Sequence, residues 1–188
     1  MKSHEDRIFT RENFDNKSFS NDIFSDCKFK NCSFQNNNFR DTQLSDCTFK
    51  NSNLHLIKLD GCRFQNVIFE ECKIVGGEFY KCDKKFFSIH FKKSILMGCN
   101  FSDLKMKATE FIGCKVKDCY FNNTFLMKSN FQDSDLQGTI FHHCDLSDAD
   151  FRNSKNYSIN PQSNVIKKAK FSSPEVLSLL SFFDIQIF

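Results

Sequence analysis

The sequence contains no run of 18 apolar residues, and this excludes a membrane-spanning helix. The first residues, Met1 to Asp6, are mostly polar or charged and do not form a secretion signal. We therefore expect a cytoplasmic protein that keeps its thiols reduced and makes no contact with a membrane.

The chain also lacks the patterns that mark catalytic and metal sites. It has 10 cysteines but no CxxC pair, and its 6 glycines form no phosphate-binding loop. No Ser–His–Asp arrangement and no paired carboxylates in a pocket can be placed. We expect no enzyme, no cofactor and no metal. A two-histidine metal site at His142 and His143 stays open as the less favoured alternative to a solvated pair.

The chain also lacks a large excess of charge of either sign. The formal net charge is +3 over 188 residues. This is too small to indicate a nucleic-acid binder, and it has the wrong sign for a protein that imitates nucleic acid. The length fits one domain or at most two small ones.

Phenylalanine is abundant, with 25 residues against no tryptophan. A large apolar residue recurs at every fifth position from Phe9 to Phe79. The register fails at Lys84 and resumes two residues out of phase from Phe91 to Phe151. All 28 of these positions are large and apolar, and 18 are phenylalanine. A period of five fits neither a helix nor a simple strand, so it predicts a repeat architecture.

The cysteines follow the same register. Nine lie two residues before one of its 28 positions, and the tenth, Cys82, lies two before Lys84, where the next position would fall; most other residues in that place are Ser, Thr, Ala or Val. This suits a square coil in which each five-residue side points one large and one small side chain inward. Four sides make a turn of about 20 residues, and turns stack about 4.8 Å apart as parallel ladders. The sequence predicts an all-β fold, a quadrilateral parallel β-helix of about seven coils, with buried thiols and no cleft for a substrate.

The register divides the chain into five segments. We expect a polar lead-in at 1–6, coils at 7–83, a bulge at 84–88 that absorbs the phase shift, coils at 89–153, and a cap and dimerisation segment at 154–188. Charged residues occupy small inward sites of the first turn, so we expect this turn to be irregular and to resist end-to-end aggregation: Arg7, Glu12, Lys17 and Asp22.

The period vanishes from Lys155 onward. Ser173, Pro174 and Glu175 predict the start of a short helix. Its apolar residues would cover the open end of the stack or meet a second copy: Val176, Leu177, Leu179, Leu180 and Phe183. Alternating residues at 184–188 predict a terminal edge strand.

The repeat resembles the pentapeptide-repeat family, whose consensus is A(D/N)LXX. The segments 134–138, 144–148 and 149–153 match it well, and the resemblance covers roughly residues 7–153. It implies a right-handed quadrilateral β-helix. The tail from Asn156 to Glu175 is similar to that of the topoisomerase-protecting, McbG- and Qnr-like branch.

That branch implies a homodimer, joined through the C-terminal helix, that imitates duplex DNA and does not itself contact nucleic acid. The implied partner is DNA gyrase or topoisomerase IV, protected from a quinolone-like or microcin-like poison.

A cluster of carboxylates bears on this implication. Between Ser129 and Asp150 the chain has five acidic residues and no Lys or Arg: Asp133, Asp135, Asp145, Asp148 and Asp150. We expect all five at outward sites near the dimer seam, where they would form a partner-binding patch. Aspartate is also the consensus residue beside the axis position, and the lysines of the tail could neutralise the patch.

Two other classes of function stay open. A β-helical scaffold or adaptor for an unrelated partner would show the same repeat. Direct nucleic-acid binding would use the lysines between Lys84 and Lys117, but inward-pointing phenylalanines leave no stacking platform outside.

Overall fold

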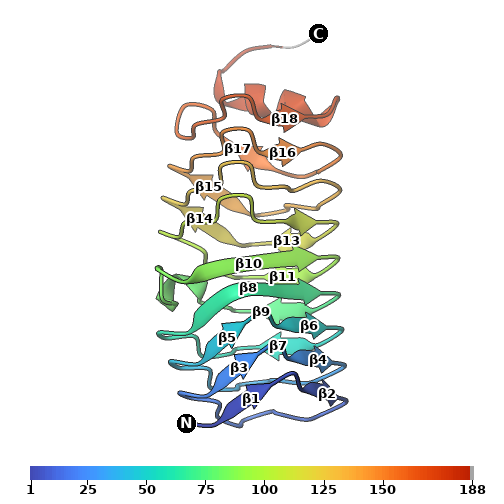
Figure 1. The fold of residues 1–188 in the computed structure, drawn as a ribbon. Helices are drawn as coiled ribbons and strands as arrows, with labels where there is room; N and C mark the ends of the chain where they lie inside the picture. The colour runs from blue at the N-terminus through green and yellow to red at the C-terminus, as the bar shows by residue number, and fades with distance from the viewer. Residues whose placement is uncertain (187–188) are drawn as a thin grey trace.

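A computed structural model describes residues 1–186 as a four-sided solenoid of parallel β-ladders with about eight turns (Figure 1). Each strand is short because each wall is only about one five-residue unit wide. The first wall contains β2 (Ile8–Thr10), β4 (Lys28–Lys30), β6 (Thr48–Lys50), β10 (Phe87–Lys92), β12 (Phe111–Ile112), β16 (Asp150–Phe151) and β18 (Lys170–Phe171).

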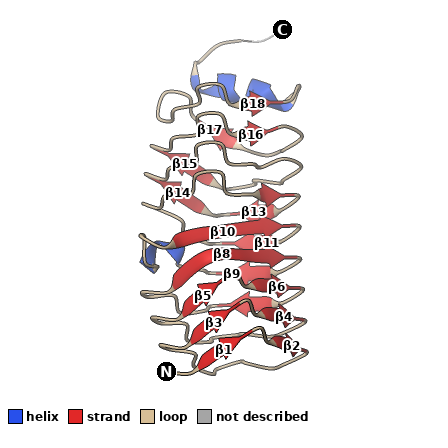
Figure 2. Ribbon diagram, in the orientation of Figure 1, coloured by secondary structure: helices blue, strands red, loops and turns tan. Residues whose placement is uncertain are grey.

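The other walls follow in chain order. The second wall contains β7 (Asn53–His55), β9 (Lys73–Val75), β11 (Ile95–Met97) and β13 (Lys115–Lys117). The third contains β14 (Tyr120–Asn122), β15 (Ile140–His142) and β17 (Ser158–Ile159), and the fourth contains β1 (Ser3–Glu5), β3 (Ile23–Ser25) and β5 (Gln43–Ser45). Strand β8 (Arg63–Glu70) runs from the fourth wall into the first, and so does β10, whose Phe87 pairs with Phe64 and whose Phe91 pairs with Phe69. Residues 1–186 also contain two 3-10 helices, η1 (Phe79–Lys81) between β9 and β10 and η2 (Glu175–Phe182) after β18 (Figure 2).

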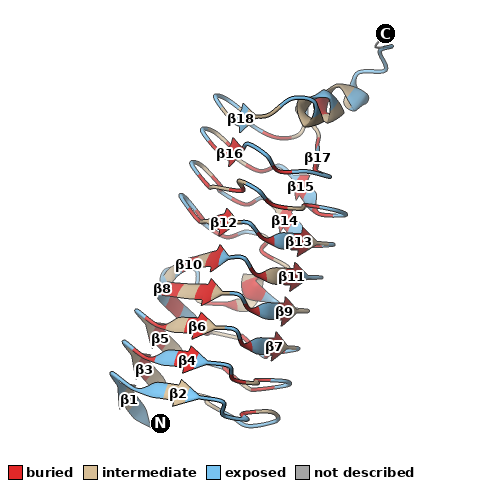
Figure 3. Ribbon diagram, turned by 90° about the vertical axis from the view of Figure 1, so that its right-hand side faces the viewer, coloured by how far each residue is buried: buried red, intermediate tan, exposed pale blue. Residues whose placement is uncertain are grey.

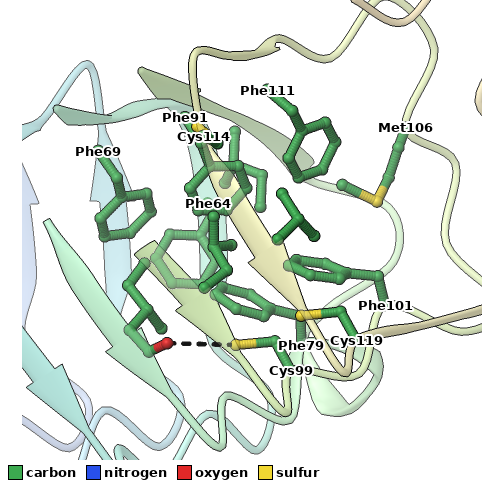
Figure 4. Packing of buried hydrophobic residues seen from close by; sticks show 14 of the residues in the cluster. Phe64, Phe69, Phe79, Phe91, Cys99, Phe101, Met106, Phe111, Cys114 and Cys119 are labelled. Carbon is green, nitrogen blue, oxygen red and sulfur yellow. Dashed lines mark hydrogen bonds between the residues drawn. The ribbon is translucent and has the colours of Figure 1, made fainter. Parts of the chain in front are cut away.

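The axis of the solenoid is filled by columns of aromatic rings. Behind the first wall, rings stack in one unbroken column with centroid separations of 4.6 to 5.3 Å: Phe9, Phe29, Phe49, Phe69, Phe91, Phe111, Phe131, Phe151 and Phe171. Columns behind the opposite first and third walls meet edge to face, as Phe111 and Phe101 do at 5.9 Å (Figure 4). The five-residue register thus defines a dry core, which Figure 3 shows as buried residues alternating with exposed ones along each coil.

The cysteines occupy the inward corners beside these columns. All ten are buried and free, as the register predicts. At the corner between the first and second walls, cysteines alternate with serines, and each serine hydroxyl accepts a hydrogen bond from the backbone N–H of the cysteine one coil earlier. Ser52 does so for Cys32 at 3.0 Å and Ser134 for Cys114 at 2.9 Å. Small inward residues therefore tie neighbouring coils together as well as fill space.

The chain turns each corner through a left-handed backbone conformation. Two residues after most axis residues, φ is positive, as at Asn51 (48°), Asp103 (59°) and Gly138 (69°). Asn, Asp and Gly tolerate this conformation best, which explains why they recur at this place in the repeat. The recurrence of Asn, Asp and Gly at this position is a second periodic feature of the sequence, separate from the pattern of inward-pointing residues.

The phase shift is absorbed without breaking the core. Phe69 and Phe91 stack at 5.3 Å although 22 residues separate them. The pairing of β10 with β8 changes register between Phe87 and Ile89, and the extra residues form an outward turn in which Phe86 is exposed.

Three expectations about the ends of the rod need correction. The first turn is regular, because β1 pairs in register with β3 and β2 with β4, and only Asp22 of its charged inward-site residues is buried. Stacking continues beyond residue 155, since β17 pairs with β15 and β18 with β16, so the rod has about eight turns and not seven. Residues 184–186 form no strand, and the rest of the predicted terminal strand lies outside the described residues. Within residues 1–186, no helix is long and apolar enough to cross a membrane.

Candidate interaction surfaces

The five carboxylates of the predicted acidic patch do not lie on one surface. Asp145 is on the fourth wall, Asp148 on the corner that follows it, and Asp150 on the first wall. Asp133 lies on the next corner and Asp135 on the second wall. The patch therefore wraps around three sides of the last coils.

Asp150 is buried, contrary to the expectation of an outward site. Its carboxylate accepts hydrogen bonds from Arg152 Nη2 at 2.7 Å and Nε at 3.0 Å, and Lys170 Nζ lies 3.9 Å from it. The hydrogen bonds from Arg152 hold the pKa of Asp150 below its ordinary value, against the opposing effect of burial. This carboxylate is neutralised by its neighbours.

Asp135 is also paired. Its Oδ1 accepts a hydrogen bond from Asn156 Nδ2 at 2.8 Å, and its Oδ2 lies 3.7 Å from Lys117 Nζ. Burial raises the pKa of Asp135, but the bond from Asn156 and the charges of Lys117 and Lys155 outweigh it and leave the pKa lowered. Lys155 and Lys170 of the tail thus act on two of the five carboxylates.

The other three carboxylates form no ion pair within the described residues. Asp133 Oδ1 accepts a hydrogen bond from Asn153 Nδ2 at 3.1 Å, and Asp145 Oδ1 accepts one from Ser147 N at 3.0 Å. Asp148 is exposed on its corner. These three keep their charge available to a partner.

An acidic row that the sequence reasoning missed lies at the other end of the rod. Asp6, Asp26 and Asp46 occupy the same exposed corner, between the fourth and first walls, on three consecutive coils. In-register coils place them about 4.8 Å apart, and among residues 1–186 none of the three forms an ion pair. Their spacing of 20 residues is the signal that would have revealed the row in the sequence.

The C-terminal helix η2 lies across the end of the stack (Figure 1). Leu179 is 8% exposed and Val176 packs against the core, so both act as a lid. Leu177 and Phe183 are 48% and 45% exposed and face away from it. The predicted dimer residues therefore divide into a set that caps this chain and a set that is free, with Leu180 partly buried between them.

A shallow groove of about 740 Å³ follows the corner between the third and fourth walls. Its walls include the exposed side chains of Phe125 and Val165, with Asp145 between them. The rings of His142 and His143 stack beside it at 3.9 Å. In the described part of the chain no three His, Cys, Asp or Glu side chains are grouped so that they could hold a metal ion.

Comparisons with known proteins agree with this architecture. A family profile described as a pentapeptide repeat region matches residues 22–86, and one described as pentapeptide repeats (8 copies) matches residues 117–153. No curated protein sequence matches the chain.

Two solved structures, both of trypsin-treated variants of QnrB1, a plasmid-mediated fluoroquinolone resistance protein, share the fold. One has a TM-score of 0.64 at 15% identity and covers 99% of this chain and 100% of that chain. The other has a TM-score of 0.54 at 17% identity and covers 98% and 99%.

Proposed function

The chain belongs to the pentapeptide-repeat family, and from this premise we propose that it is a non-catalytic binding protein that protects a type II topoisomerase. In this proposal, the protein dimerises through η2, imitates duplex DNA, binds DNA gyrase or topoisomerase IV and counters a quinolone-like or microcin-like poison. The likeness to a fluoroquinolone resistance protein over the whole chain supports this choice of partner.

The observation that carries the proposal is the exposed row of Asp6, Asp26 and Asp46. A basic DNA-binding surface recognises regularly spaced negative charge, and duplex DNA offers one phosphate per 3.4 Å of each strand, roughly. The row offers a carboxylate about every 4.8 Å along a straight corner. Asp145 and Asp148 at the far end would add to it, whereas Asp135 and Asp150 are occupied by their own cations.

The proposal is tested by gyrase supercoiling in the presence of a quinolone. We expect the protein to restore supercoiling and the variant Asp6→Asn/Asp26→Asn/Asp46→Asn to lose most of this rescue. The matched control changes three exposed carboxylates off that corner and alters the net charge equally: Glu12→Gln, Glu71→Gln and Glu78→Gln. Equal loss in both variants would reject a role for the row. If the protein neither rescues nor inhibits supercoiling over a wide concentration range, the scaffold or adaptor alternative is favoured.

Dimerisation rests on a separate observation, the exposed apolar side of η2. Leu177→Ser/Phe183→Ser should give monomers by light scattering, because both residues are exposed in the single chain and offer apolar surface to a second copy. Ile140→Ser, at an exposed apolar residue on the third wall, is the control and should remain dimeric. If the η2 variant is still a dimer, the seam lies elsewhere.

A further inference from the structure

Six of the ten cysteines form pairs on consecutive coils. Cys27 and Cys47, Cys62 and Cys82, and Cys99 and Cys119 each share one inward corner, 20 residues apart. The backbone holds each pair in register: the N–H of the residue after the later cysteine donates to the carbonyl of the earlier one, for example Tyr120 N to Cys99 O at 2.9 Å. None of the other four cysteines has a second cysteine next to it in its column: Cys32 lies between Glu12 and Ser52, and Cys72, Cys114 and Cys144 lie between Ser, Thr or Asn residues.

The pair of Cys99 and Cys119 is completely buried. Both residues lie in the core (Figure 4), and the backbone bond from Tyr120 N to Cys99 O sets them one above the other on consecutive coils. The Cys99 thiol donates to the carbonyl oxygen of Ile74 at 3.7 Å, and the Cys119 thiol donates to that of Lys117 at 3.3 Å. Two thiols therefore occupy the same apolar corner, one coil apart.

The spacing of the coils suits an ion held between two sulfurs. Two metal–sulfur bonds of about 2.3 Å in a line span about 4.6 Å, close to the stacking distance of about 4.8 Å. The corner supplies only these two ligands, so a tetrahedral ion such as zinc would lack half of its shell. Thiolates prefer soft ions, and a divalent ion with two thiolates is neutral, which avoids burying a net charge.

We propose that the Cys99–Cys119 pair is a binding site for one soft, two-coordinate divalent cation of the mercuric type. Both thiols lose their protons to solvent, two metal–sulfur bonds form, and nothing is oxidised or reduced. The Cys27–Cys47 and Cys62–Cys82 pairs repeat the arrangement at two other corners, and the native protein takes up three equivalents.

The test is titration of the folded protein with mercuric chloride. Bound metal is counted after gel filtration, and thiolate-to-metal absorption is followed in the ultraviolet. We expect three equivalents for the native chain and two for Cys119→Ser. The matched control Cys114→Ser removes an equally buried cysteine that has serines above and below it, and it should still bind three.

Several outcomes would overturn the proposal. Equal loss in Cys114→Ser and Cys119→Ser would show that single thiols bind the ion. Uptake that begins only after the circular dichroism of the fold is lost would show that the stacked pairs do not form the site. An unchanged three equivalents in Cys119→Ser would exclude this pair in particular.

Discussion

Replacing Phe111 by alanine should cost more stability than almost any other single truncation in the rod. The ring is fully buried and stacks on Phe91 and Phe131 with centroid distances of 5.1 and 4.7 Å. It also meets Phe101 and Phe121 edge to face, at 5.9 and 5.7 Å. Truncation removes the buried ring and leaves a cavity between two rigid coils that cannot collapse onto each other.

The expected loss for Phe111→Ala is about 4 kcal/mol in the free energy of unfolding. Phe111→Leu keeps most of the apolar volume and loses the ring contacts, each worth about 0.5–1.5 kcal/mol beyond burial, so we expect about 1–3 kcal/mol. Phe9→Ala is the matched control. Phe9 lies in the end coil, is partly exposed and stacks on a ring at one side only, so its loss should be about 1–2 kcal/mol.

The measurement is urea unfolding followed by far-ultraviolet circular dichroism. The urea midpoint should be lowest for Phe111→Ala. The midpoints of Phe111→Leu and Phe9→Ala should be higher, with Phe111→Leu equal to or below Phe9→Ala. The dependence of the unfolding free energy on urea concentration should be unchanged. A lower slope would mean that the rod has split into separately unfolding halves, which stacked repeats permit. A midpoint for Phe111→Ala no lower than that of Phe9→Ala would refute the view that the unbroken column dominates stability.

Three further predictions concern the corners, a charged pair and the thiols. Gly138→Ala should destabilise by about 1–3 kcal/mol in urea unfolding, because φ is +69° and the new Cβ would clash with Asp118 Oδ1. Adding Asp118→Ala should recover part of the loss, and no recovery would exclude the clash. Asp150→Asn should cost about 1 kcal/mol at neutral pH. The folded pKa of Asp150 is depressed. The stability difference between the native chain and Asp150→Asn should therefore persist above about pH 4 and vanish as the pH falls through the folded pKa. A stability difference that is independent of pH would contradict the charge pairing. A bulky aromatic disulfide reagent, unlike a bare metal ion, should find almost no reactive cysteine in the native protein at neutral pH and all 10 after denaturation, because the thiols are buried and burial raises the pKa of Cys62 and Cys82. Rapid native labelling by this reagent would show that the core opens.

The five-residue register predicted the core because burial in a solenoid depends on local position alone. A residue such as Leu136 or Phe141 is inward whatever its neighbours are, so one sequence rule places it. The tail has no such register. Tyr157 and Ile159 enter the core out of step with the repeat, which is why the last turn was missed.

The candidate surface was harder to predict because surface chemistry depends on the coils above and below. The segment from Ser129 to Asp150 contains no basic residue that could pair with Asp150. Arg152 and Lys170 lie beyond that segment in the sequence, yet both approach the Asp150 carboxylate in the structure. In the same way, Asp6 and Asp26 look unrelated in the sequence and become neighbours only when the chain is read with a period of 20.

The coil that contains Phe86 has 22 residues instead of 20, and it indicates where such a chain can gain length during evolution. Because the two extra residues leave the wall outward while Phe69 and Phe91 still stack, the fold tolerates added length wherever it is expelled from the interior. The turn after Asp83 is thus a permissive insertion point, where a foreign peptide could be displayed without refolding the rod. New binding loops can arise there by small genetic insertions, independently of the selection that maintains the aromatic columns.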